Sequence, residues 1–215
     1  MFEDRMEAGQ KLAKALRHHR NHDVVVLGLP RGGVPIAFEI AKALHAPMDI
    51  VFVRKIGLPS APEIAMGAVV DGARPHIFRN EAVIQRVSVT EEVFQSAVED
   101  ELRTIAKRKA VFKDVLPRRD IKGKTVILVD DGLATGSTMK AVLSAIKESD
   151  VGHTIIAVPV APASAISALE NEADEIICLE ATHFFRGVGG FYRHFPQLSD
   201  DDVIGYLRPQ MLAQS

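Results

Sequence analysis

The chain has 215 residues, of which 47% are hydrophobic and 25% are charged, and its formal charge at pH 7 is −2. This composition provides enough apolar side chains for a sizeable core, and the length favours one domain with an appendage. The slightly negative charge argues against nucleic acid or an anionic membrane as the main partner. The single Cys178 excludes an internal disulfide. No apolar run reaches membrane-spanning length, and the charged N-terminus does not resemble a signal peptide, so we expect a cytoplasmic location.

Apolar runs rich in β-branched residues alternate with amphipathic segments along the chain, which is typical of strands alternating with helices. In chain order, the pattern predicts a helix over 2–20, a strand over 23–29, a helix over 34–44, a strand over 49–55, a helix over 90–112, a strand over 124–130, a helix over 136–148, a strand over 153–160, a helix over 163–171, a strand over 175–179 and a helix over 199–207. Such alternation predicts an α/β fold in which a parallel sheet is covered by helices on both faces.

The middle of the chain interrupts this alternation. Glycines and prolines predict a loop at 57–62, and two short apolar runs, 65–70 and 75–79, predict an antiparallel hairpin. We expect a single domain over 1–215, with its core at about 23–180. A flexible lid is expected at about 56–117 and a C-terminal hood within 181–215.

The segment 126–138, VILVDDGLATGST, is the most informative stretch of the sequence. Its apolar part has the character of a buried parallel strand, which places Asp130 and Asp131 at the carboxyl end of that strand, where α/β sheets bind ligands. The following turn opens a helix and presents backbone N–H groups and hydroxyls suited to a phosphate. A Walker A loop is excluded because Ser137 stands where that motif has its lysine.

This segment resembles the phosphoribosyl-diphosphate (PRPP) motif of type I phosphoribosyltransferases. In that family the two acids hold the ribose hydroxyls and the loop holds the 5′-phosphate. The resemblance implies that Asp130 and Asp131 are the catalytic acids. It also implies that five consecutive residues bind the 5′-phosphate, namely Ala134, Thr135, Gly136, Ser137 and Thr138.

Two further clusters follow strands and resemble the pyrophosphate-binding parts of the same family. The first is Arg31-Gly32-Gly33, in which consecutive glycines allow close backbone approach and the guanidinium suits phosphate. The second is Arg54-Lys55, which the predicted strand 49–55 places at the same edge of the sheet. Without the family, the first cluster is equally well explained as a tight turn with a solvated arginine. The alternative for the second cluster is a solvated Arg-Lys pair.

The acceptor is less well defined by the sequence. Members of this family carry a hood that selects the base, and either the N-terminal helix or the aromatic and glycine-rich run 184–195 is a candidate for it. The same run is also compatible with an aromatic cluster that caps the sheet. The 6-oxopurine enzymes commonly have an aspartate where this chain has Ala134, so a 6-oxopurine acceptor is disfavoured.

The resemblance implies an enzyme that transfers the 5-phosphoribosyl group from PRPP to a nitrogen acceptor, a nucleobase in most of the family, and releases pyrophosphate. Mg²⁺ is the implied cofactor, which Asp130 and Asp131 would contact through water rather than directly. A regulator that senses PRPP or a nucleotide on the same fold is the alternative function, and a homo-oligomer is compatible with either.

Overall fold

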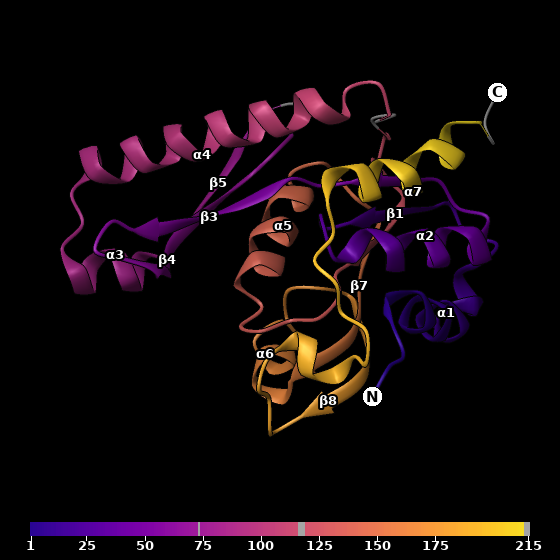
Figure 1. Ribbon diagram of the computed structural model, residues 1–215. Helices are drawn as coiled ribbons and strands as arrows, with labels where there is room; N and C mark the ends of the chain where they lie inside the picture. The colour runs from indigo at the N-terminus through magenta and orange to yellow at the C-terminus, as the bar shows by residue number, and fades with distance from the viewer. Residues whose placement is uncertain (73, 116–118, 213–215) are drawn as a thin grey trace.

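The computed structural model describes residues 1–72, 74–115 and 119–212. Five parallel strands form the main sheet in the order β2-β1-β6-β7-β8 (Figure 1). The strands are β1 (Val24–Gly28), β2 (Met48–Ile50), β6 (Thr125–Val129), β7 (His153–Pro162) and β8 (Glu175–Thr182). Because β1 and β6 are adjacent at the centre, the loops that follow them lie side by side at one edge of the sheet.

Helices cover both faces of this sheet, as the alternation predicts. Along β1, Val24 and Val26 point into one apolar layer, whereas Val25 and Leu27 point into the other. Three helices pack on the first layer: α1 (Arg5–Ala15), α2 (Gly33–Leu44) and α7 (Asp200–Leu212). Two others, α5 (Ser137–Lys147) and α6 (Ala163–Ser167), pack on the second. The expected fold class is therefore confirmed.

A second sheet projects from this core as an arm (Figure 1). It contains the antiparallel strands β3 (Val53–Leu58), β4 (Ala61–Val70) and β5 (His76–Arg79), followed by α3 (Glu81–Val87) and α4 (Glu91–Phe112). The predicted hairpin and long helix are confirmed, and Thr90 caps that helix by accepting from the Val93 N–H. The sequence reading missed α3, which Asn80 caps.

Two predictions for the arm are wrong. The expected strand 49–55 is two strands, because the chain leaves the parallel sheet after Ile50 and pairs with β4 from Val53 onward. The expected loop 57–62 is largely strand, since β3 continues to Leu58 and β4 starts at Ala61. The hairpin geometry explains why residue 57 is glycine. The pairing of β3 with β4 shifts register at Gly57, and a Cβ on this residue would lie 2.5 Å from the Pro62 carbonyl oxygen. Of the expected lid, residues 73, 116 and 117 lie outside the described residues.

The N-terminal helix is also shorter than the predicted 2–20. Asp4 caps α1 by accepting from the Glu7 N–H, and α1 gives way to a 3₁₀ turn, η1 (Arg17–His19). A second 3₁₀ turn, η2 (Val188–Phe191), lies in the expected hood, whose last residues, 213–215, are outside the described part. The remaining elements lie where they are predicted, with three larger differences at their ends. The helix α6 stops four residues before the end of the expected helix 163–171, α7 continues five residues beyond the expected 199–207, and β8 continues three residues beyond the expected 175–179. Among the described residues, no helix is both long and apolar enough to cross a bilayer.

Candidate functional site

The acid pair lies directly after β6, at the carboxyl end of the central strands. The Asp131 backbone N–H donates to Asp130 Oδ1 at 2.9 Å, so the first acid is oriented by the backbone of the second. Burial raises the pKa of Asp130 well above its usual value, and the neighbouring Asp131 charge raises it further. Burial also raises the pKa of Asp131. Burying two adjacent carboxylates is energetically costly unless hydrogen-bond donors or positive charges compensate them.

Arg5 of α1 provides such a charge. Its Nε and Nη2 both donate to Asp131 Oδ2 at 2.9 Å, and its Nη1 donates to the Pro196 carbonyl at 2.9 Å. The Arg5 side chain is only 9% exposed, and its guanidinium lies 3.8 Å from the centre of the Phe195 ring. The charge of Arg5 and its hydrogen bond to the carboxylate lower the pKa of Asp131, although burial raises this pKa by more.

The two stretches proposed as alternatives for the hood lie together. Phe2 pairs with Tyr192 in a parallel bridge, with one backbone hydrogen bond from Phe2 N–H to the Phe191 carbonyl and one from Arg193 N–H to the Phe2 carbonyl. This pairing places the Tyr192 hydroxyl 2.7 Å from the Asp131 carbonyl oxygen, to which it donates. The N-terminus and the aromatic run therefore cover the acid pair jointly.

The Arg31-Gly32-Gly33 loop packs against the same acids. A Cβ on Gly32 would lie 1.9 Å from Asp131 Oδ2, and one on Gly33 would lie 2.3 Å from the Val129 carbonyl oxygen. Only glycine fits at such distances. Arg31 and Gly32 line a cavity of about 290 Å³ together with Arg5 and Phe195, so the loop predicted to bind pyrophosphate adjoins the acid pair.

The loop predicted to bind the 5′-phosphate precedes α5. Gly136 has a φ of +74°, a conformation that suits glycine, and it forms the N-cap of the helix. Gly136 has no side chain with which to cap α5, and the Ser137 N–H donates to Thr135 Oγ1 at 3.4 Å, so the next N–H groups of the first turn suit a ligand. Thr135 and Ser137 contact each other through their hydroxyls at 3.0 Å. The backbone of Ala134–Thr138 thus has the form of a phosphate cradle.

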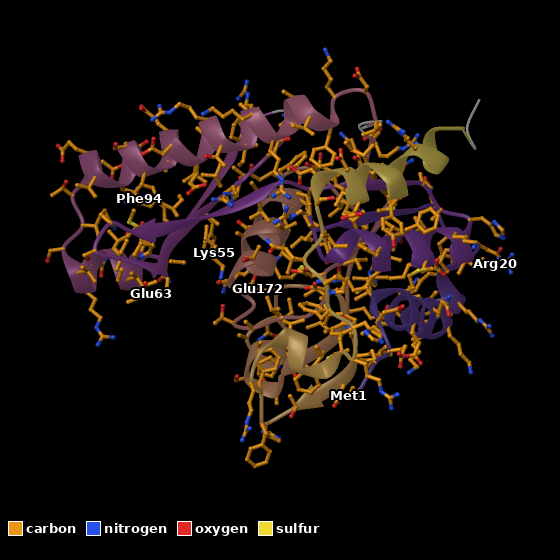
Figure 2. The ribbon with its side chains drawn as sticks, viewed as in Figure 1. Met1, Arg20, Lys55, Glu63, Phe94 and Glu172 are labelled. Atoms are coloured by element: carbon orange, nitrogen blue, oxygen red, sulfur yellow. The ribbon has the colours of Figure 1, made fainter. Side chains whose placement is uncertain are left out.

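Arg54 and Lys55 reach the site by a different route from the predicted one. They lie within β3 of the arm rather than at the end of a core strand, which corrects the predicted placement. Arg54 pairs with Glu101 of α4 at 2.8 Å. Lys55 extends from β3 on the side of α5 (Figure 2), and its charge lowers the pKa of Asp130 against the larger effect of burial. Both line a cavity of about 620 Å³ that also includes Thr138 of the phosphate cradle.

Three of the contacting residues were missed by the sequence analysis: Arg5, Tyr192 and Phe195. Arg5 and Tyr192 lie 126 and 61 positions from Asp131, and no spacing rule connects them to it. The only signal was the concentration of aromatic residues in 184–195, which marked the segment without showing which of its residues face the acids.

The carboxylate pair offers hard oxygen donors of the type that Mg²⁺ prefers. However, Arg5 already donates twice to Asp131 Oδ2, and Asp130 Oδ1 accepts from the backbone. Asp130 and Asp131 are therefore the residues that would hold a magnesium ion through water, and the ion would supply positive charge toward a bound diphosphate.

Comparisons with known proteins agree with this geometry. A family model for the phosphoribosyl transferase domain matches residues 2–194. A candidate phosphoribosyl transferase of Mycobacterium tuberculosis is 38% identical over 208 residues, which are 96% of this chain and 46% of that protein. This chain thus spans about half the length of that curated relative. The bifunctional protein PyrR of Chloroflexus aurantiacus is 36% identical over 126 residues, covering 57% of this chain and 60% of PyrR.

A solved structure extends the comparison to the whole fold. The crystal structure of TT1426 from Thermus thermophilus superposes with a TM-score of 0.85 at 36% identity, covering 98% of this chain and 99% of TT1426. At that coverage, the arm and the C-terminal region are shared together with the core.

Proposed function

This chain belongs to the phosphoribosyltransferase family, and on that premise we propose that it transfers the 5-phosphoribosyl group of PRPP to a nitrogen acceptor. One observation carries the proposal: the acid pair after β6, the phosphate cradle before α5 and the glycine loop after β1 adjoin one another at one edge of the sheet. Together they match the three polar parts of PRPP, which are its ribose diol, its 5′-phosphate and its diphosphate.

In the proposed reaction, the bond between ribose C1 and the diphosphate oxygen breaks and a bond from C1 to the acceptor nitrogen forms. The diphosphate keeps the electron pair, and the nitrogen loses a proton to solvent. Positive charge develops on the ribose ring at this stage. Asp130 and Asp131 would orient the ribose hydroxyls and stabilise that charge, so catalysis consists mainly of placement and charge compensation.

The remaining residues would hold the two ends of PRPP. The Ala134–Thr138 backbone anchors the 5′-phosphate, while Arg31, Gly32, Gly33 and Lys55 receive the diphosphate. Arg54 contributes only once it parts from Glu101, because its guanidinium is already paired. When bound, Mg²⁺ would neutralise charge on the leaving diphosphate.

The acceptor is proposed to be a nucleobase that needs no carboxylate base in the PRPP loop, because Ala134 offers none. Tyr192 cannot substitute as a base near neutral pH, since burial raises its pKa above the usual value for tyrosine. The proposal therefore disfavours 6-oxopurines and leaves the other bases open.

Pyrophosphate release from PRPP and Mg²⁺, measured across a panel of nucleobases, tests the proposal. We expect release with at least one base, and a loss of several orders of magnitude in the double variant Asp130→Asn/Asp131→Asn. Circular dichroism and thermal unfolding would show that the double variant is folded. Near-normal transfer by this variant would refute the roles given to the acids.

The same panel separates the enzyme from the alternative function. A wild-type protein that binds PRPP in titration calorimetry but turns over no base would contradict the transferase proposal. That result would favour a regulator that senses PRPP through the same site.

A further inference from the structure

A cluster of histidines lies at the opposite edge of the sheet from the acid pair. Three histidines fall within five residues, His18, His19 and His22, at and just after η1. They lie beside Glu175, the first residue of β8. His18 Nε2 lies 3.6 Å from Glu175 Oε1, and His19 Nε2 lies 3.0 Å from Oε2, so each imidazole faces a different oxygen of one carboxylate. The proposed transferase chemistry uses none of these residues.

The burial of His19 makes an ordinary ion pair a poor account of the cluster. The His19 side chain is only 8% exposed, and a charged imidazolium at this depth would lose most of its hydration. Its Nδ1 is buried and has no hydrogen-bond partner among the described residues. Because Nε2 is the ring nitrogen that faces Glu175, the polar contacts of the buried His19 ring among the described residues lie on that side. A neutral imidazole is also the form that binds metals.

The distances in the cluster suit a small tetrahedral ion. One donor atom each from His18, His19 and Glu175 all lie within 4.8 Å of one another. Ligands about 2.1 Å from a tetrahedral zinc ion are separated by about 3.4 Å. The two nitrogen–oxygen distances of 3.0 and 3.6 Å bracket this separation. Two imidazoles and one carboxylate form a donor set that zinc prefers and that magnesium or calcium does not.

We propose that His18, His19 and Glu175 form a binding site for a zinc-class divalent cation. The fourth position is left to water or to His22, whose ring lies edge-on to that of His19 at 5.6 Å. The ion would join η1 to β8. Because α1 leads directly into η1 and carries Arg5 near its start, this site would fix the helix that provides the counter-ion of Asp131. The site is independent of the transferase proposal.

Metal binding by untagged protein tests this inference. After exhaustive dialysis against a chelator, titration with ZnCl₂ should show one site per chain, and CoCl₂ should give the visible absorption of a tetrahedral cobalt site. His18→Gln and Glu175→Gln remove partly exposed ligands, and each should weaken binding at least tenfold. His183→Gln, which changes an exposed histidine outside the cluster, is the matched control and should bind as the wild type does.

His19 itself is avoided in the test because its burial couples it to folding, and the thermal unfolding of each variant shows that it is folded. The inference is overturned if the wild type shows no stoichiometric site. It is also overturned if zinc binds equally well after the His18 and Glu175 changes, since the ion would then occupy another site such as Asp130 and Asp131.

Discussion

Arg5 and Asp131, 126 positions apart, form a two-donor contact in which the guanidinium Nε and Nη2 both reach Asp131 Oδ2 at 2.9 Å. A fork of this kind fixes the carboxylate as well as neutralising it. Asp131 Oδ2 stays engaged by both donors. The reactivity of the acid pair therefore depends on a residue of the first helix.

Removal of Arg5 should shift the pH dependence of the site. Burial raises the pKa of Asp131 and Arg5 lowers it, so Arg5→Gln leaves the burial effect unopposed and raises that pKa. If the ionised acid binds ribose, the acidic limb of the kcat/KM profile for PRPP moves to higher pH. Arg5→Lys keeps the charge but loses the fork, so it should move the limb less.

Tyr192→Phe is the control for Arg5, because it removes a neutral contact to the Asp131 carbonyl and disturbs the same hood. The acidic limb of the kcat/KM profile of Tyr192→Phe should stay at the wild-type pH, even if the substitution changes kcat. If the acidic limb of the kcat/KM profile is also unchanged in Arg5→Gln, the ion pair only holds the hood in position.

Asp130→Asn should stabilise the fold while it damages function. Because the folded-state pKa of Asp130 is raised above the usual 3.8, the folded protein holds that proton to higher pH than the unfolded chain does. The contribution of Asp130 to the free energy of unfolding is therefore present at low pH, and it is lost as the pH rises from about 4 through the folded-state pKa. The variant avoids this cost, so its Tm at pH 7 should exceed that of the wild type.

A gain of about 1 kcal/mol would appear as about 2–4 °C in a chain of this length. The difference should shrink as the pH approaches 4, where both proteins are uncharged at position 130. A lower Tm for Asp130→Asn at pH 7 would contradict the burial argument. Calorimetry at several pH values measures both trends.

Gly32→Ala should damage the site through a single methyl group. The added Cβ would lie 1.9 Å from Asp131 Oδ2, so either the loop or the carboxylate must move. We expect PRPP affinity to fall at least tenfold and the free energy of unfolding to fall by about 1–3 kcal/mol. Gly190→Ala places its methyl group in open space and should change stability by less than about 0.5 kcal/mol. Equal effects of the two changes in calorimetric titration would remove Gly32 from the site.

Lys55 and Arg54 should differ in importance although they are neighbours. The charge of Lys55 acts on Asp130, whereas Arg54 is paired with Glu101. Lys55→Gln should therefore raise the KM for PRPP about tenfold, which corresponds to about 1.4 kcal/mol. Arg54→Gln should raise it less. A larger increase in KM for Arg54→Gln than for Lys55→Gln would show that Arg54 leaves Glu101 when substrate binds.

The local part of the site could be predicted from the sequence because one continuous segment encodes it. An apolar β-branched run ends at Asp130 and Asp131, and the turn at Gly136 follows before the next helix, so short-range pattern fixes the strand, the acids and the cradle together. Arg31-Gly32-Gly33 could be placed for the same reason, because β1 and β6 end at the same edge.

The rest of the site depends on contacts that no local pattern contains. Residues 49–55 have the composition of one strand, and only pairing with β4 shows that the chain changes sheets between Ile50 and Val53. Likewise, Arg5 is one charge among several on an amphipathic helix. Its role follows from how α1 packs beside the hood, which requires the tertiary structure.

The bridge between Phe2 and Tyr192 has a consequence for how the protein matures during synthesis. Arg5 and Pro196, whose contact closes over Asp131, are 191 positions apart. A ribosome would have to release almost the whole of this sequence before that contact could form. The central strands β1, β2 and β6, the last of which ends at Val129, can therefore emerge before the protein gains a complete reaction centre.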